Sequence, residues 1–259
     1  MMNAPDAHRR GRGLLRVLNW ILDVVVILTI LLAMAYSIYS IWDNNSIYQA
    51  AMDLSARIRK EKPEGEKPSF EDLQKINKDV CAWITLEGTQ IDNPVVQGSD
   101  NEEYLNKDVY GDYSLAGTLF LDTRCNRDFT DFNELVYGHH MDRHQMFGDL
   151  DLYLEKRFFD KHTDGTLLIP GQKIPVTVFS VMVVSSRDRW IFDPVAADEE
   201  PAAYLDYVSS ESKHVRTDLL DKIKAEPERY HVLTLSTCST YLDENRTIVL
   251  AAYELSAES

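Results

Sequence analysis

Cysteine is scarce in this chain, and the usual metal-binding patterns are missing. The 259 residues include only three cysteines, Cys81, Cys125 and Cys238. There is no CxxC pair, no Cys/His spacing typical of zinc, and no loop with the regularly spaced carboxylates of a calcium site. We therefore expect neither a metal nor a cofactor. Cys81 and Cys125 either pair with each other or stay as two buried thiols, and the sequence leaves both possibilities open.

Basic residues are also few. The chain carries 27 lysines and arginines against 42 acidic residues, a formal net charge of −15. Four of the arginines lie within residues 1–42 beside two acids, so the remainder has 23 basic and 40 acidic residues. A surface so negative repels phosphate backbones, and we expect no nucleic-acid partner. Internal repeats and low-complexity tracts are absent from the sequence as well.

Long apolar runs are absent except for one near the N-terminus. Val24–Ile41 is 18 residues long, and its clearly polar members are Thr29, Ser37 and Ser40. Trp20 and Trp42 bracket this run, about 33 Å apart along a helix, which is close to the thickness of a bilayer. The pattern predicts a transmembrane signal anchor over residues 20–42.

The arginines predict how this anchor is oriented. All four arginines of residues 1–42 precede the apolar run, so residues 1–19 should stay in the cytoplasm and the bulk of the chain should lie outside the cell. The predicted localisation is the cell membrane, as a single-pass protein. A cleaved signal peptide is the alternative, because Ala33-Met34-Ala35 offers small residues at a suitable spacing. The apolar run continues unbroken through Ile41, and this length favours an uncleaved anchor.

Residues 43–78 are expected to form a helical extension with a linker. Asp43–Lys60 has helical periodicity, and Asp43 or Asn44 could cap it. Residues 61–68 are charged and contain proline and glycine, which indicates an exposed linker. A short helix is predicted over Ser69–Asn77, with Ser69 as its N-cap.

From Val80 onward the hydrophobic period becomes two, the period of strands. Eight short strands with polar connections predict an all-β barrel or sandwich with helical additions over residues 79–259. The expected strands are Val80–Leu86, Thr89–Gln97, Gly117–Asp122, Glu134–His139, Gly165–Pro170, Ile174–Ser185, Tyr230–Cys238 and Arg246–Glu254. The expected helices are Asp100–Lys107, Met146–Lys161, Pro201–Ser210 and Thr217–Ala225. The last two form a long insertion between strands six and seven, and such insertions often build the wall of a site.

The stretch from Tyr230 to Tyr253 places a cysteine and an arginine at two strand ends. Two apolar, β-branched runs flank a short polar loop, which is typical of paired antiparallel strands. Because side chains alternate, Leu233 and Leu235 share one face and Cys238 lies on the other. Arg246 begins the partner strand eight positions later. A small buried cysteine is the alternative interpretation of Cys238, and the strand alone does not exclude it.

A second polar stretch, Asn133–Leu150, contains three histidines. A strand there ends in His139-His140, and histidine is the usual proton-exchanging partner of a nucleophilic thiol. Alternation means that one of these two points away from any site. His140 and His144 are four residues apart, as in helical metal sites. The segment between them lacks helical periodicity and an evident third ligand, so we expect no metal here.

Together these stretches resemble the sortases, membrane-anchored transpeptidases of Gram-positive bacteria, and in particular the class B members. The resemblance rests on Thr234-Leu235-Ser236-Thr237-Cys238 with Arg246, on Tyr137-Gly138-His139-His140-Met141 and on Met146-Phe147-Gly148. It covers about residues 70–255 and includes the helical insertion before Cys238. It implies an eight-stranded closed sortase-type β-barrel with the site at strand ends.

The resemblance also implies residue roles. Cys238 matches the family's nucleophile, His139 its histidine and Arg246 its arginine. The implied reaction cleaves a C-terminal sorting signal after its threonine, forms a thioester on Cys238 and transfers the acyl group to an amine of a peptidoglycan precursor. The hydroxyls of Ser236 and Thr237 are further candidates for contacts to the oxyanion or the substrate.

Partners and alternatives follow from the same resemblance. The expected partners are surface proteins with an NPxTN-like, PPxTG-like or SPxTG-like signal, together with the cell-wall acceptor. No third, carboxylate member of a triad is evident, although Asp122 and Asp142 can be considered. The same thiol chemistry would also serve pilin polymerisation or hydrolysis. A non-enzymatic, membrane-tethered binding module with a structural cysteine is the alternative from another class.

Overall fold

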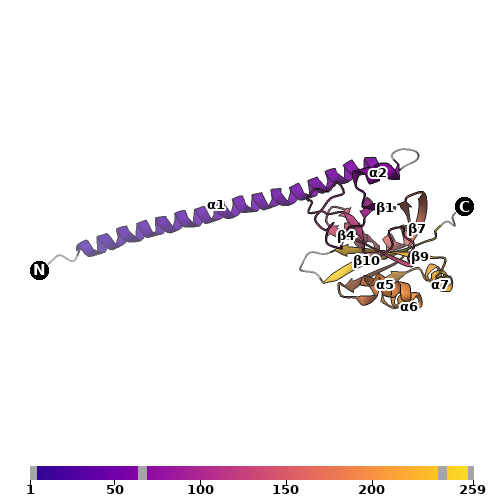
Figure 1. Ribbon diagram of the computed structural model, residues 1–259. Coiled ribbons are helices and arrows are strands. Elements are labelled where there is room, and N and C mark those ends of the chain that lie inside the picture. The colour runs from indigo at the N-terminus through magenta and orange to yellow at the C-terminus, as the bar shows by residue number, and fades with distance from the viewer. Residues whose placement is uncertain (1–4, 64–68, 239–243, 256–259) are drawn as a thin grey trace. The chain divides into compact units, whose positions relative to one another are not determined.

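The computed structural model describes residues 5–63, 69–238 and 244–255, with residues 5–14 as backbone alone. The chain forms two compact units, Met1–Gln49 and Ala50–Ser259. Helix α1 (Pro5–Ile58) makes up the first unit and continues into the second. Figure 1 shows the strands and the remaining helices gathered in the second unit.

Helix α1 contains the predicted anchor. From Leu15 onward it is long and apolar enough to cross a membrane by length and composition, and its most apolar window is not buried in the structure. The expectation of a separate helix that begins at Asp43 or Asn44 is wrong, because α1 runs through both residues to Ile58. No glycine or proline lies between Trp42 and Ile58 to end the helix.

Two short helices follow α1. The 3-10 helix η1 (Arg59–Glu61) continues directly from it, and α2 (Phe70–Ile76) comes next among the described residues. The predicted cap of α2 is confirmed: the Ser69 hydroxyl accepts from the backbone N–H of Asp72, and the Asp72 carboxylate accepts from that of Ser69. Such a reciprocal pair satisfies two of the N–H groups that a helix start leaves unpaired.

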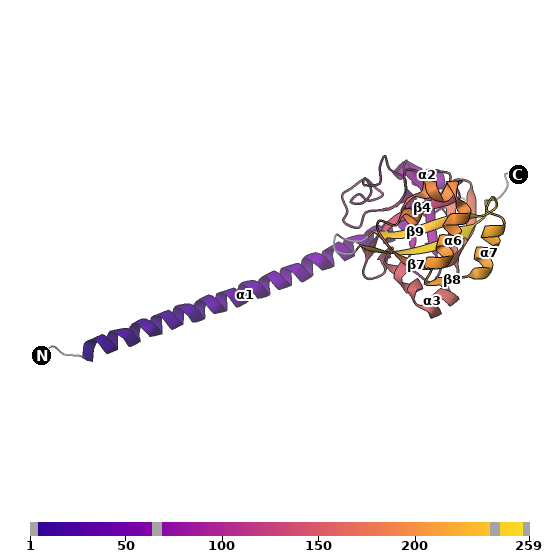
Figure 2. The same cartoon turned by 90° about the horizontal axis from the view of Figure 1, so that it is seen from below.

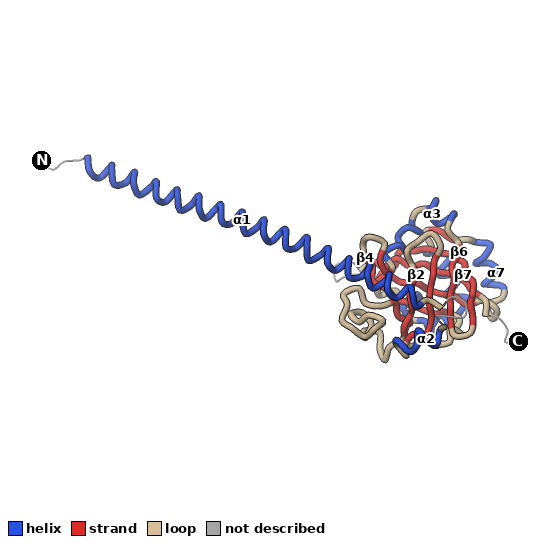
Figure 3. Tube along the Cα trace, turned by 90° about the horizontal axis from the view of Figure 1, so that it is seen from above, coloured by secondary structure: helices blue, strands red, loops and turns tan. Residues whose placement is uncertain are grey.

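Eight strands close into a barrel, as predicted. The pairing order is β10-β9-β4-β3-β2-β1-β6-β7, and β7 pairs with β10 to complete the circle. Figure 3 shows the strands in red, gathered in the second unit. These strands are β1 (Val80–Leu86), β2 (Asp92–Val96), β3 (Leu119–Leu121), β4 (Asn133–Met141), β6 (Asp164–Ile169), β7 (Gln172–Ser185), β9 (His231–Cys238) and β10 (Asn245–Tyr253). Two-residue strands β5 (Gln145–Met146) and β8 (His214–Val215) pair with β4 and β7.

Alternation along β9 and β10 divides their apolar side chains between two clusters. Leu233, Leu235 and Val249 belong to the cluster that fills the barrel. Val232, Ile248 and Leu250 point the other way and belong to a second cluster with the helices of the insertion. Figure 2 shows α6 and α7 on the side of the barrel where β7 and β9 are labelled. Strands β9 and β10 are therefore covered by apolar side chains on both faces.

The insertion between β7 and β9 holds four helices: α4 (Arg189–Phe192), α5 (Pro194–Glu199), α6 (Pro201–Glu211) and α7 (Thr217–Ala225). The predictions for α6 and α7 are confirmed. The first two were not predicted, because four and six residues are too short to show a hydrophobic period. The insertion thus begins with short turns of helix close to the end of β7.

Two predicted helices differ from the structure. Residues 100–107 form turns, because the Asp100 carboxylate accepts from the backbone N–H groups of Glu102 and Glu103. The expected helix over Met146–Lys161 is divided into β5, the 3-10 helix η2 (Gly148–Leu154) and α3 (Lys156–Lys161). Gly148 explains the tight first part, since a Cβ there would lie 1.9 Å from the Met141 carbonyl oxygen.

Candidate functional site

Three neighbouring strands bring the predicted site residues into one row. Strands β4 and β9 are parallel, and their register pairs His139 with Cys238. Strands β9 and β10 are antiparallel, and the pair Ile248 with Ser236 fixes their register. When this register is continued by two residues, toward the end of β9 and the start of β10, Arg246 lies opposite Cys238. Adjacent strands are about 4.8 Å apart, so the row is compact.

Cys238 is half-buried at the end of β9, on the face opposite the barrel core, as predicted from alternation. Burial raises the pKa of its thiol to about 11, and the charge of Arg246 and a backbone hydrogen bond with Gly138 oppose this rise. The thiol is thus mostly protonated near neutral pH, and a neighbouring base has to take its proton before it can act as a nucleophile.

His139 is half-buried, and one of its ring nitrogens is already engaged. Nε2 lies 2.6 Å from the backbone carbonyl oxygen of Leu105. A carbonyl oxygen only accepts hydrogen bonds, so Nε2 carries a proton and Nδ1 is the nitrogen left to exchange one. Leu105 therefore fixes both the ring orientation and the tautomer, a role that a carboxylate often fills.

Of the two carboxylates considered for this role, Asp122 binds elsewhere. It accepts from Arg124, Asn101 and Tyr137. Asp142 lies just after β4, in the turn toward β5. Sequence reasoning missed Leu105, because its contribution is a backbone atom that only the fold brings to His139.

The two hydroxyl residues before Cys238 lie on opposite faces of β9. Ser236 shares the face of Cys238, and its buried hydroxyl donates to the carbonyl of Thr237 at 3.2 Å. The Thr237 hydroxyl accepts from the backbone N–H of Thr247 at 3.0 Å and so bridges β9 to β10. Ser236 thus lies on the same face as Cys238, whereas the Thr237 hydroxyl links the two strands that carry Cys238 and Arg246.

A cleft of about 450 Å³ opens beside this row. It brings together the loop before β3, the ends of β4, β9 and β10, and the start of the insertion. Its lining residues are Asn101, Glu102, Leu105, Phe120, Tyr137, Ser186, Phe192, Ser236, Thr237, Cys238 and Arg246. The insertion contributes Ser186 and Phe192 to a wall, whereas the two helices from which a wall was expected, α6 and α7, do not line the cleft.

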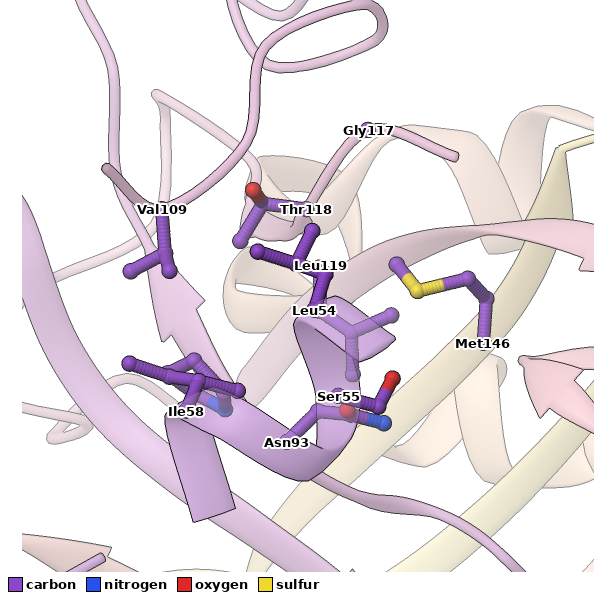
Figure 4. A pocket seen from close by; sticks show the side chains of 10 residues that line it. Leu54, Ser55, Ile58, Asn93, Val109, Gly117, Thr118, Leu119 and Met146 are labelled. Atoms are coloured by element: carbon purple, nitrogen blue, oxygen red, sulfur yellow. The ribbon is translucent and has the colours of Figure 1, made fainter. Parts of the chain in front are cut away.

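A second hollow lies between the end of α1 and the barrel (Figure 4). Leu54, Ser55 and Ile58 line it from α1, and Leu119 and Met146 line it from the barrel. Its accessible space is about 20 Å³, room for about one water molecule. This hollow is therefore far smaller than the cleft beside Cys238 and has no room for a peptide.

The other two histidines of this stretch are paired with acids. His140 Nε2 lies 2.7 Å from Asp151, and His144 Nδ1 lies 2.5 Å from Asp149. The Asp151 side chain raises the pKa of His140. Among the residues that the structure describes, no group of three or more potential ligands is placed to hold a metal.

Cys81 and Cys125 are both buried free thiols, so the disulfide that the sequence left open is not formed in the structure. Burial raises the pKa of Cys81 to about 12, and it raises that of Cys125 as well. Neither thiol lines the cleft, and thiols buried in this way are inert.

Comparison with curated proteins gives two similar relatives, although no model of a protein family matches the chain. Sortase B of Staphylococcus aureus is 33% identical over 187 residues, which cover 72% of this chain and 74% of the relative. Sortase B of Listeria monocytogenes is 31% identical over 177 residues, which cover 68% and 70%.

Solved structures agree with these relatives. A Streptococcus pyogenes class B sortase involved in pilus biogenesis is 36% identical, with a TM-score of 0.65, and the match covers 73% of this chain and all of that one. A Staphylococcus aureus sortase B–substrate complex is 29% identical, with a TM-score of 0.64, and the match covers 83% and 97%. The chain belongs to the class B sortases and is a cysteine transpeptidase of that family.

Proposed function

We propose that this transpeptidase cleaves a C-terminal sorting signal after its threonine, keeps the acyl product as a thioester on Cys238 and transfers it to an amine of a cell-wall precursor. The observation that carries the proposal is the row of His139, Cys238 and Arg246, of which Cys238 and Arg246 line the cleft of about 450 Å³. The solved substrate complex of a related sortase B supports a peptide substrate for this cleft.

The first half of the reaction uses all three residues. The Cys238 thiol gives its proton to Nδ1 of His139, and the sulfur attacks the threonine carbonyl carbon. The negative charge that develops on the carbonyl oxygen is stabilised by the permanently charged Arg246. The Ser236 hydroxyl becomes a further donor when it rotates away from the Thr237 carbonyl. The C–N bond then breaks, and the His139 imidazolium protonates the departing amine. A thioester and a free amine result.

The second half runs through the same groups. The incoming amine gives a proton to neutral His139 as its nitrogen attacks the thioester carbonyl. The C–S bond breaks, a new amide forms, and the sulfur regains a proton from His139. In this scheme His139 Nε2 keeps its bond to the Leu105 carbonyl, so Nδ1 makes every transfer.

The domain organisation that we propose keeps this chemistry outside the cell. Residues 1–19 are cytoplasmic, residues 20–42 span the membrane as an anchor, residues 43–78 form the helical extension, and residues 79–259 form the catalytic barrel. The exposed apolar surface of α1 supports the anchor, because such a surface is stable in lipid and unfavourable in water.

The substrate signal that we propose is NPxTN-like, with PPxTG-like and SPxTG-like signals as alternatives, and the acceptor is a peptidoglycan-precursor amine. Pilin polymerisation onto a lysine is a second candidate function. It is favoured by two similar solved structures, the Streptococcus pyogenes sortase involved in pilus biogenesis and the sortase B of a Streptococcus pneumoniae type II pilus. Only the acceptor amine differs between these functions.

Substitutions in the row test the residue roles. Cys238→Ala and His139→Ala should each lower transpeptidation of an NPxTN peptide by about a thousandfold or more, and Arg246→Ala by about a hundredfold or more, because each removes a group that acts at the reacting carbonyl. The measurement is the rate of ligation to an amine acceptor, followed by liquid chromatography. His140→Ala is the matched control and should stay within a few-fold of wild type. A loss in His140→Ala with retention in His139→Ala would reverse the assignment.

A further inference from the structure

A fully buried carboxylate, Asp122, lies just beyond the end of β3 and accepts five hydrogen bonds. Its Oδ1 accepts from the backbone N–H and from Nε of Arg124, each at 2.9 Å. Its Oδ2 accepts from Nη2 of Arg124 at 2.8 Å, from Nδ2 of Asn101 at 2.9 Å and from the hydroxyl of Tyr137 at 3.0 Å. Burial raises the pKa of Asp122, but the hydrogen bonds and the charge of Arg124 lower it by more than burial raises it. The net pKa is below the usual value, and the carboxylate is ionised.

These donors connect three separate walls of the cleft. Asn101 belongs to the loop between β2 and β3, and Tyr137 belongs to β4. Arg124 reaches the insertion as well, since its Nη2 donates to the Phe192 carbonyl at 2.8 Å. The Tyr137 and Phe192 rings are stacked, with centroids 6.3 Å apart and planes at 7°. Asn101, Tyr137 and Phe192 all line the cleft, whereas Asp122 itself does not.

Two of these walls have little regular structure of their own. Asn101 lies in turns, and α4 is a single turn of four residues. Isolated segments of this kind are not stable without tertiary contacts. The part of the loop that holds His139 has anchors of its own, because the Tyr104 carbonyl accepts from Thr118 and the Tyr104 hydroxyl bonds with Asn77 and Asp79. Loss of the hydrogen bonds to Asp122 would therefore loosen the walls of the cleft that Asn101 and Phe192 form. The hydrogen bond between His139 and the Leu105 carbonyl would stay in place.

We propose that Asp122 is a positioning residue for substrate binding: it holds Asn101, Tyr137 and, through Arg124, Phe192 in the arrangement that fits the sorting-signal peptide. The inference rests on the proposed function of the cleft. Asp122 in this role affects how tightly the peptide binds, and it does not contact the reacting atoms.

Asp122→Asn is the informative change because it keeps the shape of the side chain. An amide has one acceptor oxygen and one donor nitrogen. In one orientation the NH₂ group faces two of the five donors, and in the other orientation it faces three. Two donors cannot bond with each other, so the residues of the cleft walls lose these hydrogen bonds. The Michaelis constant for the peptide should rise about tenfold, as expected for lost hydrogen bonds to a charged group. The alkylation rate of Cys238 should stay within about twofold of wild type, since neither His139 nor Arg246 is touched.

Asp92→Asn is the matched control. Asp92 also accepts from a ring N–H, a hydroxyl and a cation, those of Trp83, Thr85 and Lys62, and none of these residues lines the cleft. This variant should keep the wild-type Michaelis constant. Tyr137→Phe removes one of the five donors to Asp122 and should raise the Michaelis constant by about threefold. This variant replaces Asp122→Asn in the experiment if Asp122→Asn does not fold.

Backbone hydrogen exchange supplies a readout that does not need turnover. Residues 100–103 and 189–193 should exchange faster in Asp122→Asn than in wild type or in Asp92→Asn. An unchanged Michaelis constant and unchanged exchange in Asp122→Asn, or in Tyr137→Phe if the first variant is unfolded, would overturn the inference. Wild-type protein without any acyl-enzyme would instead contradict the proposed function, and the exchange comparison would still decide the role of Asp122.

Discussion

The surroundings of Cys238 oppose its ionisation, and this has a measurable consequence. Burial raises the pKa of the thiol to about 11, while the positive charge of Arg246 lowers it. The thiolate is the reactive form, so its fraction should grow about tenfold for each pH unit from pH 7 to pH 10. The rate of alkylation by iodoacetamide should rise in the same way, and Arg246→Ala should alkylate more slowly than wild type at each pH.

Peptide mapping after alkylation provides the control, because Cys81 and Cys125 are buried and should remain unmodified in the folded protein. A rate that levels off below about pH 9 would mean that the thiol ionises more easily than its burial implies. In that case a stronger positive influence than Arg246 alone acts on Cys238.

Some site residues could be predicted from the sequence because they lie on strands with a periodic pattern, whereas others are brought to the site by loop packing and could not. Cys238 and Arg246 are carried by neighbouring strands of one hairpin, so local alternation and spacing were enough to bring them together. His139 lies 99 positions before Cys238, and its place beside the thiol depends on the parallel pairing of β4 with β9. The Leu105 carbonyl and the Asp122 bonds depend on loop packing, which leaves no periodic pattern in the sequence.

At the scale of elements, hydrophobic period was a good guide to strands and a poor one to short helices. Strand β1 was predicted with its observed bounds, as was α7. The helix predicted at residues 100–107 is a set of turns because Asp100 caps the backbone locally. Helix α1 continues through Asp43 and Asn44, where a separate helix was expected to begin. Both residues can cap the start of a helix, but neither ends a helix that already runs through them without a glycine or proline.

The segment from β4 to η2 makes a stability prediction. Arg143, His144 and Met146 all have positive φ, and Gly148 follows them with its Cα against the Met141 carbonyl. A Cβ on Gly148 would lie 1.9 Å from that oxygen, so Gly148→Ala must displace η2 and the carboxylates of Asp149 and Asp151. We expect a loss of about 3 kcal/mol or more in the free energy of unfolding, measured by denaturant titration.

Gly171→Ala is the comparison for this change. Gly171 has a φ of +80°, and a Cβ added to it would meet nothing within 4 Å beyond its chain neighbours. Alanine there therefore costs only backbone strain, about 1 to 2 kcal/mol. Equal losses in the two variants would show that the close approach of Gly148 to Met141 is not what shapes this segment.

At the scale of the whole molecule, the proposed topology requires Cys238 to lie outside the cell. A membrane-impermeant maleimide applied to intact cells should label the full chain, and Cys238→Ala should remain unlabelled because the other two thiols are buried. The chain should stay in the membrane fraction after a high-salt wash, since an apolar helix is held by lipid rather than by charge. Labelling only after permeabilisation would place the barrel on the cytoplasmic side.

Intact-mass spectrometry can detect the thioester that we propose between Cys238 and the threonine of a sorting signal. The protein is incubated with short peptides that carry NPxTN, PPxTG or LPxTG. We expect a mass increase equal to the N-terminal peptide fragment through its threonine, given by at least one of these peptides and absent in Cys238→Ala. An adduct that persists in Cys238→Ala, or no adduct with any peptide while Cys238 still reacts with iodoacetamide, would contradict this proposal.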